Sequence, residues 1–88
     1  MNVQFRASFA KDLRNIKNKD LLSRIMEAVE QFEKAHSLQS IANIKKLRGT
    51  GNYYRVRVGE HRIGLVVEGD TATLVRCLNR REIYRYFP

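Results

Sequence analysis

The chain has 88 residues, of which 43% are hydrophobic and 30% charged, and its formal net charge is +8. This composition argues against a disordered chain, and the length suits one domain (1–88) with one small core. A single cysteine excludes an internal disulfide, and the sequence has neither an N-terminal apolar run nor an 18-residue apolar window. We therefore expect a cytoplasmic protein without a signal peptide or a membrane span.

The positive charge lies mainly in the C-terminal half. Residues 1–44 hold seven Lys/Arg against five Asp/Glu, or +2, and residues 45–88 hold ten against four, or +6. A basic excess in one half favours a polyanionic partner such as RNA or DNA, or an acidic protein. An anionic membrane surface is disfavoured because these basic residues fall in predicted strands and loops rather than on an amphipathic helix.

The N-terminal half has the pattern of one strand followed by two helices. Residues 2–5 alternate in polarity, which is typical of a short strand. Ser8 is a candidate cap for a helix over 9–16, and Asn18 or Asp20 caps a second helix that extends to about residue 35. Spaced apolar residues in 36–52 indicate a short helical turn followed by a link.

Residues 53–67 have the clearest pattern in the chain, that of a β-hairpin. Apolar and basic residues alternate on both sides of Gly59-Glu60, which suits a two-residue type II′ turn. The predicted pairs are Val58–His61, Arg57–Arg62, Val56–Ile63, Arg55–Gly64 and Tyr54–Leu65. Because like charges directly opposite destabilise a sheet, this face favours a bound polyanion. The alternative is a solvated face whose arginines are balanced by Glu60 and Glu68.

The third strand of this half, 71–79, has two candidate registers. With a three-residue turn at 68–70, Val75 and Cys77 are buried. A two-residue turn instead buries Ala72, Leu74 and Leu78. Because the second register would turn Arg76 toward the core, we favour the first.

The order of the elements predicts an α+β fold. A strand, two helices and three further strands are expected to give a small antiparallel sheet, with the last three strands in a meander and the first strand joining it. The helix pair packs on one face, and the face that carries the arginines is left open. The tail, 80–88, is basic and aromatic and is expected to end without a further helix.

Common catalytic and metal-binding patterns are missing from the sequence. His36 and His61 lie far apart without metal-ligand spacing, and Cys77 has the character of a small buried hydrophobe. His61 is expected to pack at a sheet edge, and we expect no metal and no cofactor. Arginines interleave with aromatic residues in the hairpin and the tail, which suits RNA because guanidinium groups bind phosphate and rings stack on unpaired bases. The alternative for the tail tyrosines is packing back onto the core.

These motifs together resemble the RelE/ParE superfamily of toxins from bacterial type II toxin–antitoxin systems. The matching segments follow the N-terminal strand and helix pair, and they are Lys46-Leu47-Arg48-Gly49, Tyr54-Arg55-Val56-Arg57-Val58-Gly59, His61-Arg62-Ile63 and Arg80-Arg81-Glu82-Ile83-Tyr84. The RelE-like branch, which we favour, is known for cutting mRNA in the ribosomal A site. The alternative is a ParE-like inhibitor that binds DNA gyrase without catalysis. Either branch implies a cognate antitoxin that folds on binding.

The resemblance also implies roles for individual residues. In the RelE-like reaction the RNA 2′-OH attacks the adjacent phosphate and gives a 2′,3′-cyclic phosphate and a free 5′-OH. The implied catalytic residues are Arg62 and Arg81, which hold the scissile phosphate, and Tyr84, which stacks on a base or positions the nucleophile. The implied RNA-binding residues are Arg48, Arg55, Arg57, Arg80 and Tyr86, with Tyr86 as the alternative to Tyr84. Arg55 and Arg57 are implied either to grip the RNA or to polarise the 2′-OH. Many relatives carry a histidine where Asn79 stands, so the resemblance leaves the group that transfers the proton unassigned.

Overall fold

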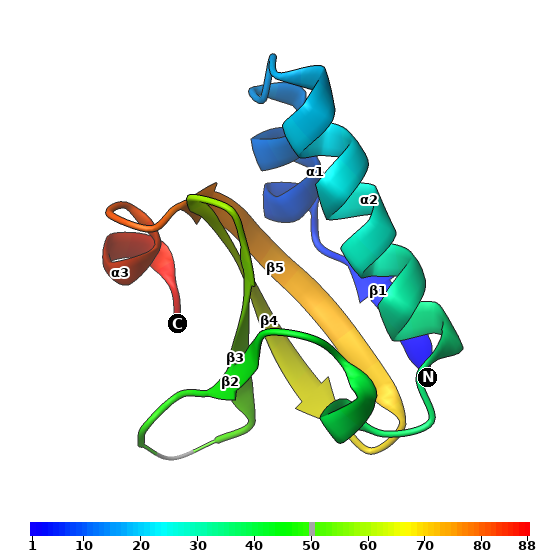
Figure 1. Ribbon diagram of the computed structural model, residues 1–88. Helices are drawn as coiled ribbons and strands as arrows, with labels where there is room; N and C mark the ends of the chain where they lie inside the picture. The colour runs from blue at the N-terminus through cyan, green and yellow to red at the C-terminus, as the bar shows by residue number, and fades with distance from the viewer. Residues whose placement is uncertain (50) are drawn as a thin grey trace.

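The computed structural model describes residues 1–49 and 51–88. Within these residues the chain forms a five-stranded sheet that lies between a helix pair and a short C-terminal helix (Figure 1). The strands are β1 (Asn2–Phe5), β2 (Ile44–Lys46), β3 (Tyr53–Val58), β4 (His61–Glu68) and β5 (Thr71–Asn79). The helices are α1 (Ala7–Arg14), α2 (Lys19–Lys34) and α3 (Ile83–Tyr86), and a 3₁₀ turn covers Leu38–Ser40.

The predicted α+β fold is confirmed, with two differences in the sheet. The strand order is β1-β5-β4-β3-β2, and β3, β4 and β5 form the expected antiparallel meander. Strand β1 joins the sheet as predicted but pairs with β5 in parallel, so the sheet is mixed. Strand β2 pairs with β3 at the outer edge, where the sequence predicts only a link.

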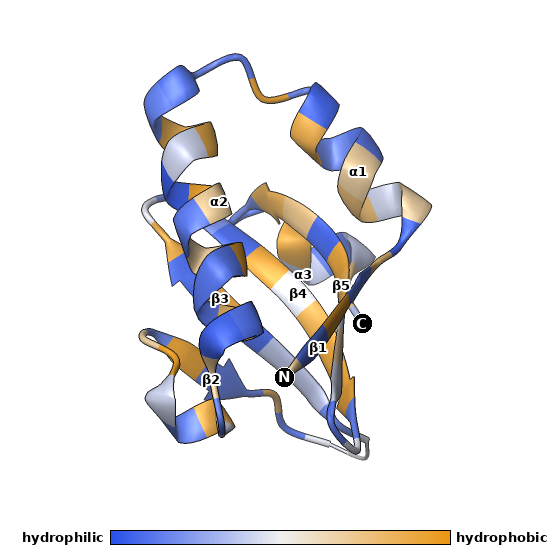
Figure 2. Cartoon of the chain, turned by 90° about the vertical axis from the view of Figure 1, so that its right-hand side faces the viewer, coloured by the Kyte–Doolittle hydropathy of each residue, from blue (hydrophilic) through white to orange (hydrophobic). Residues whose placement is uncertain are grey.

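The helix pair covers one face of the sheet with its apolar side chains. Phe9 of α1 and Ile25 and Phe32 of α2 are buried in the core, and Figure 2 shows hydrophobic segments of β4 and β5 beneath these helices. The side chain of Asn18 caps α2 by accepting a hydrogen bond from the backbone N–H of Leu21 at 3.1 Å. No helix in the described residues combines the length and the apolar character that a membrane span needs.

The predicted hairpin register is confirmed in every pair between Val58–His61 and Tyr54–Leu65. Gly59 has a φ of +58°, and Glu60 is not among the residues with positive φ. Positive φ at the first turn residue alone is the signature of a type II′ turn, which matches the right-handed twist of the flanking strands. The alternation of side chains and the turn chemistry therefore position Arg55, Arg57 and Arg62 on one face.

Strand β5 combines parts of both predicted registers. Its turn contains two residues, because Glu68 pairs with Thr71, so the favoured three-residue turn is wrong. The residues buried before the bulge are Ala72 and Leu74. A bulge leaves Val75 without a partner on β4 and shifts the alternation by one position. Cys77 is therefore buried, as predicted, without turning Arg76 into the core.

Helix α1 closes the edge of β5 beyond the point where β1 ends. The side chain of Ser8 does not cap the helix as predicted; its Oγ donates a hydrogen bond to the carbonyl oxygen of Val75 at 2.6 Å. Asp12 is only 6% exposed, and its Oδ2 accepts a hydrogen bond from the backbone N–H of Cys77 at 2.9 Å. Its carboxylate also binds Arg76 through Nε at 2.8 Å and Nη2 at 3.0 Å. Polar side chains of α1 thus satisfy backbone groups that no strand reaches.

The C-terminal tail packs on the face that the sequence predicts to be open. Ile83 begins α3 and Phe87 directly follows it, and these two residues are 0% and 5% exposed. The Phe87 ring meets the edge of Tyr53 at 5.7 Å between centroids, and a Cβ on Gly64 would lie 2.6 Å from the same ring. The predictions of an open face and of a tail without a helix are therefore wrong, because apolar side chains at helical spacing anchor the tail.

Candidate functional site

Four cations lie next to one another on the α3 side of the sheet, and we call them the cationic cluster (Lys45, Arg55, Arg57 and Arg62). Lys45 lies directly opposite Arg55, and Arg57 lies directly opposite Arg62. The ion pairs in the described part of the chain are Arg76–Asp12 and Arg80–Glu60. No carboxylate in the described part of the chain forms an ion pair with the cationic cluster. The repulsion within its two like-charge pairs is therefore not offset by an ion pair.

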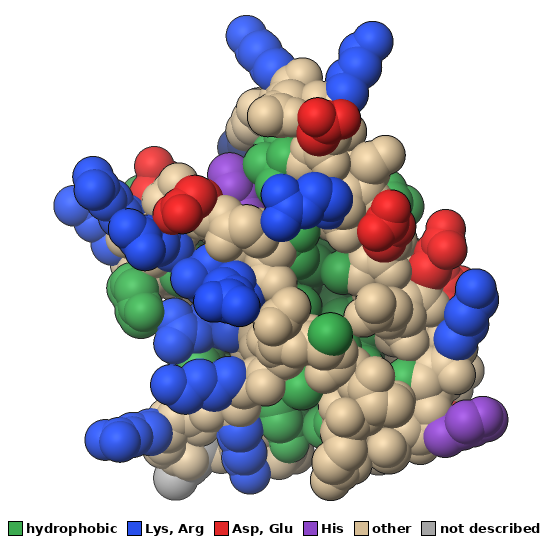
Figure 3. All heavy atoms as spheres, in the orientation of Figure 1, with side chains coloured by type: hydrophobic (Ala, Val, Ile, Leu, Met, Phe, Trp, Pro, Cys, Tyr) green, Lys and Arg blue, Asp and Glu red, His purple; other side chains and the backbone are tan. Residues whose placement is uncertain are grey.

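The cationic cluster opens into a shallow cavity of about 340 Å³. Its lining residues are Asn43, Ile44, Lys45, Arg55, Arg57, Arg62 and Tyr84. Figure 3 shows Lys and Arg side chains gathered over β2, β3 and α3 on the left of the molecule, with acidic side chains at the upper end of this group and over α2 on the right. An open cavity lined by cations suits a phosphate group, because the positive potential of neighbouring charges adds up there.

Tyr84 lies over this cavity because the tail is anchored on both sides of it. Its neighbours Ile83 and Phe87 are buried, while Tyr84 itself is 71% exposed. The guanidinium carbon of Arg55 is 4.6 Å from the centre of the Tyr84 ring. Hydrogen bonding and positive charge from Arg55, with the charges of Arg62 and Lys45, lower the pKa of the Tyr84 phenol. The cluster therefore favours the phenolate form of this side chain.

Titration of Tyr84 is expected at a lower pH than titration of an ordinary tyrosine. The phenolate absorbance of the protein minus that of a Tyr84→Phe variant isolates this group from the other tyrosines. Replacing Arg55 by Gln should move the titration back toward the ordinary value, because Arg55 is the main cause of the lowered pKa. Arg85→Gln is the matched control on the same helix and should leave it unchanged. If Arg55→Gln also left it unchanged, the contact between the two side chains would be wrong.

Arg62 is held at the hairpin turn by the backbone. Its Nη1 donates hydrogen bonds to the carbonyl oxygens of Gly59 and His61, each at 3.0 Å. These neutral acceptors fix the guanidinium group without cancelling its charge. The remaining N–H groups stay available for a phosphate, which guanidinium can bind through two parallel hydrogen bonds.

The other predicted site residues do not line the cavity. The side chain of Arg80 pairs with Glu60 at 3.1 Å in an exposed ion pair. The backbone N–H of Arg81 donates to Asn79 Oδ1 at 3.0 Å, and its side chain is exposed. Arg48 is exposed in the link between β2 and β3. Tyr86 turns away from the cluster, and its ring lies 5.2 Å from the Arg76 guanidinium carbon.

Sequence reasoning missed Lys45 because it missed β2. A three-residue strand has too short an alternation to stand out, and Lys45 acquires its place in the cluster only by pairing with Arg55. Asn43 lines the same cavity, and its φ of +63° places it in the left-handed region. Asparagine tolerates this conformation better than most residues, so an Asn before an apolar–basic pair was the available signal.

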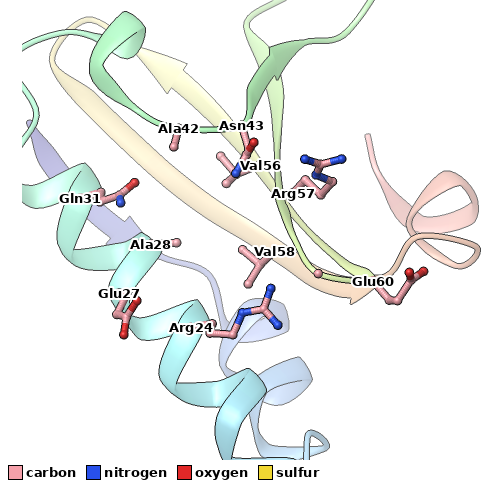
Figure 4. A pocket seen from close by; sticks show the side chains of 11 residues that line it. Arg24, Glu27, Ala28, Gln31, Ala42, Asn43, Val56, Arg57, Val58 and Glu60 are labelled. Carbon is pink, nitrogen blue, oxygen red and sulfur yellow. The ribbon is translucent and has the colours of Figure 1, made fainter.

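A larger groove of about 440 Å³ runs between α2 and β3 (Figure 4). Its lining residues include Ala28, Val56 and Val58, with charges of both signs around them. Figure 4 shows Arg24 and Glu27 extending from α2, and Arg57 and Glu60 on the hairpin side. Because its charges are mixed, the groove lacks the unbalanced positive potential of the smaller cavity, and we do not assign the candidate site to it.

Histidine and cysteine offer no alternative chemistry in the described residues. No group of three His, Cys, Asp or Glu side chains there is arranged to hold a metal ion. Burial raises the pKa of the Cys77 thiol to about 12, with a further contribution from Asp12, so the nucleophilic thiolate is disfavoured. His61 begins the central strand β4 directly after the hairpin turn, and burial lowers its pKa against the opposing effect of Glu82.

Comparisons with known proteins agree on one family. A family model described as the ParE toxin of the type II toxin–antitoxin system parDE matches residues 3–84. The chain is 43% identical over 89 residues to Toxin RelE3 of Methanocaldococcus jannaschii, with 100% of each chain covered. It is similar to the crystal structure of the RelB–RelE antitoxin–toxin complex from Methanococcus jannaschii, with 41% identity, a TM-score of 0.82 and coverage of 97% of this chain and 99% of that chain. A YoeB–YefM complex from Staphylococcus aureus is similar at 25% identity and a TM-score of 0.71, covering 91% and 97%.

Proposed function

We propose that this chain, which belongs to the RelE/ParE superfamily as a RelE-family toxin of a type II toxin–antitoxin system, is a ribosome-dependent mRNA endonuclease. The observation that supports this most is the cationic cluster, which lines a cavity without a carboxylate partner among the described residues. A protein that only bound an apolar surface of a partner would have no need for these like-charge pairs. Action on mRNA in the ribosomal A site would place the protein in the cytoplasm.

In the proposed reaction the 2′-OH of the mRNA attacks the adjacent phosphate. Negative charge accumulates on the phosphate oxygens in the transition state, and preorganised cations stabilise it more than they stabilise the substrate. We assign Arg62 to the scissile phosphate, because backbone carbonyls hold its guanidinium group in place. Arg55 and Arg57 would grip the neighbouring RNA backbone. For Arg81, which lies outside the cavity lining, we propose phosphate contact only once RNA is bound.

Tyr84 is the proposed acceptor of the 2′-OH proton. An arginine is a poor base because guanidinium stays protonated at ordinary pH, whereas the pKa of the Tyr84 phenol is lowered by the arginines around it. Asn79 cannot take this role, although a histidine stands there in many relatives. We therefore assign to Tyr84 on α3 the proton-accepting role that the resemblance left open.

Mapping of mRNA 5′ ends after induction of the protein tests the endonuclease proposal. We expect new ends inside coding regions at a constant position within the codon, because cleavage would occur in the ribosomal A site. Arg62→Ala should remove these ends and restore growth, since it deletes the guanidinium group assigned to the phosphate. Arg14→Ala, an exposed arginine on α1 far from the cavity, is the control and should cut as the wild type does. Full cleavage by Arg62→Ala would contradict the site.

Inhibition of DNA gyrase is the second candidate function. The matching family model carries the description of the ParE toxin, and a ParE-like gyrase inhibitor is the alternative that the sequence left open. It predicts DNA damage and an SOS response after induction, with no codon-phased mRNA ends. The same induction experiment separates the two candidates, since transcripts and DNA damage can be measured in one culture.

A cognate antitoxin is the proposed protein partner. Both solved relatives described above are complexes: one is the RelB–RelE antitoxin–toxin complex and the other is the YoeB–YefM complex. For this chain we propose a partner that places acidic side chains against the cationic cluster and so excludes RNA. Coexpression with the product of the neighbouring gene should restore growth, and binding of the two proteins should weaken as salt concentration rises. Growth arrest that persists under coexpression would argue against that partner.

A further inference from the structure

Lys45 stands out in the cationic cluster because its side chain can release a proton. Three of the four cations are arginines, and guanidinium groups keep their protons. The ammonium group of lysine serves as a proton donor in many enzymes. Cleavage of RNA by its own 2′-OH needs two proton transfers, one away from the nucleophile and one to the 5′ oxygen that leaves. Tyr84 accounts for only the first of these.

The sheet places Lys45 beside the residues assigned to the phosphate. It lies opposite Arg55 on the edge strand β2, on the face that carries the cavity, and it lines that cavity together with Arg62 and Tyr84. Its charge is close enough to Tyr84 to contribute to the lowered pKa of the phenol. Lys45 is also exposed, so its long side chain is free to follow a bound RNA. Among the residues that line the cavity, Lys45 and Tyr84 are the two whose side chains can exchange protons.

We propose that Lys45 is the general acid of this site and donates a proton to the 5′ oxygen as it leaves the phosphate. This inference rests on the proposed endonuclease function. The Tyr84 phenolate takes the proton of the 2′-OH, the 2′ oxygen bonds to phosphorus, and the bond from phosphorus to the 5′ oxygen breaks. The ammonium group of Lys45 protonates that oxygen, giving a 2′,3′-cyclic phosphate and a 5′-OH. Solvent then returns the proton from Tyr84 to Lys45, so the cycle needs no other reactant.

The ionisation of Tyr84 responds to cations from each strand that meets the cavity. Arg55 and Arg57 extend from β3 and Arg62 extends from β4, and the positive charges of Arg55 and Arg62 favour the phenolate of Tyr84. Lys45, on β2, carries an ammonium proton that these guanidinium groups cannot supply. The arrangement therefore assigns opposite roles to the two groups, with Tyr84 as the base and Lys45 as the acid.

Single-turnover cleavage of ribosome-bound mRNA tests the role of Lys45. The substrates carry either the natural 5′ oxygen or a bridging 5′ sulfur at the cleavage site. A thiolate leaves without protonation, so the sulfur substrate does not need a general acid. Lys45→Gln should cut the oxygen substrate at least about 100-fold more slowly than the wild type, yet cut the sulfur substrate at about the wild-type rate. Lys45→Arg should behave similarly, because it keeps the charge but does not release a proton.

Lys46 provides the matched control on the same strand. It is exposed like Lys45 but pairs with Tyr54 on the opposite face, so Lys46→Gln should cut both substrates normally. An equal loss on both substrates in Lys45→Gln would show that Lys45 only binds RNA, and no loss on either would remove it from the site. Either result would overturn the inference and leave the endonuclease proposal standing. If the wild-type protein cut neither substrate, the proposed function itself would fail.

Discussion

Replacing Asp12 by alanine is expected to lower the free energy of unfolding by about 3 kcal/mol. The carboxylate is 6% exposed and holds Arg76 through two hydrogen bonds and the backbone N–H of Cys77 through a third. Removing it leaves a cation without its partner and a buried N–H without an acceptor. Because the Arg76 side chain is 24% exposed, water compensates part of the loss, and the value lies at the low end for a broken buried pair.

Denaturant unfolding of the two proteins measures this difference. Asp20→Ala is the control, since Asp20 is exposed in the first turn of α2 and should cost at most about 1 kcal/mol through the helix dipole. Combining Asp12→Ala with Arg76→Met should recover part of the loss, because the unpaired cation is then gone. If Asp12→Ala lowered the free energy of unfolding no more than Asp20→Ala does, α1 would not hold the edge of β5 through the Asp12 carboxylate.

The hairpin could be predicted from the sequence because its structure depends on local rules. Alternation sets which side chains share a face, and a Gly-X turn sets the register between the strands. The pairing of Arg57 with Arg62 follows from these two rules and is found in the structure. The electrostatic argument for a polyanion therefore came from the sequence, although the roles of the individual arginines stay predictions.

The parts that sequence reasoning missed depend on contacts between distant segments. The bulge at Val75 reconciles a two-residue turn with a buried Cys77, and no local pattern marks a bulge at a valine. Asp12 binds the backbone of Cys77, which lies 65 residues further along the chain. No local pattern in the sequence predicts a contact over that separation. The tail was different, since Ile83 and Phe87 have the i, i+4 spacing of a buried helix turn and could have been recognised.

The residues that line the cavity also divide into those placed by local strand pairing and those placed by contacts between distant segments. Strands β3 and β4 bring the arginines together by local pairing, whereas Lys45 and Tyr84 arrive from a short edge strand and from the tail. The two proton-transferring groups that we propose, Lys45 and Tyr84, are therefore the ones whose position depends on contacts between distant segments. The tail is thus part of the proposed active site, and its attachment to the sheet becomes a test of that site.

Replacing Gly64 by alanine is expected to detach the tail and to reduce RNA cleavage. Gly64 does not have a positive φ, so the backbone accepts alanine, but its Cβ would lie 2.6 Å from the Phe87 ring. The ring has little room to retreat because it meets Tyr53 edge-on and is itself buried. Phe87 must therefore leave its site, and the protein should lose about 2–3 kcal/mol of stability, somewhat less than for deleting a core phenylalanine.

The consequence for the site follows from the position of Tyr84 between Ile83 and Phe87. Once Phe87 is displaced, α3 loses its second anchor and Tyr84 no longer stays over Arg55, so its titration should return toward that of an ordinary tyrosine. Phe87→Ala should have the same effects, and the double variant should be no worse than either single one, because the alanine methyl then occupies the vacated space. Additive losses in the double variant would show that Gly64 and Phe87 act separately. If Tyr84 in Gly64→Ala still titrated at the lowered pH of the wild type, Ile83 alone would hold the tail. RNA cleavage should then persist.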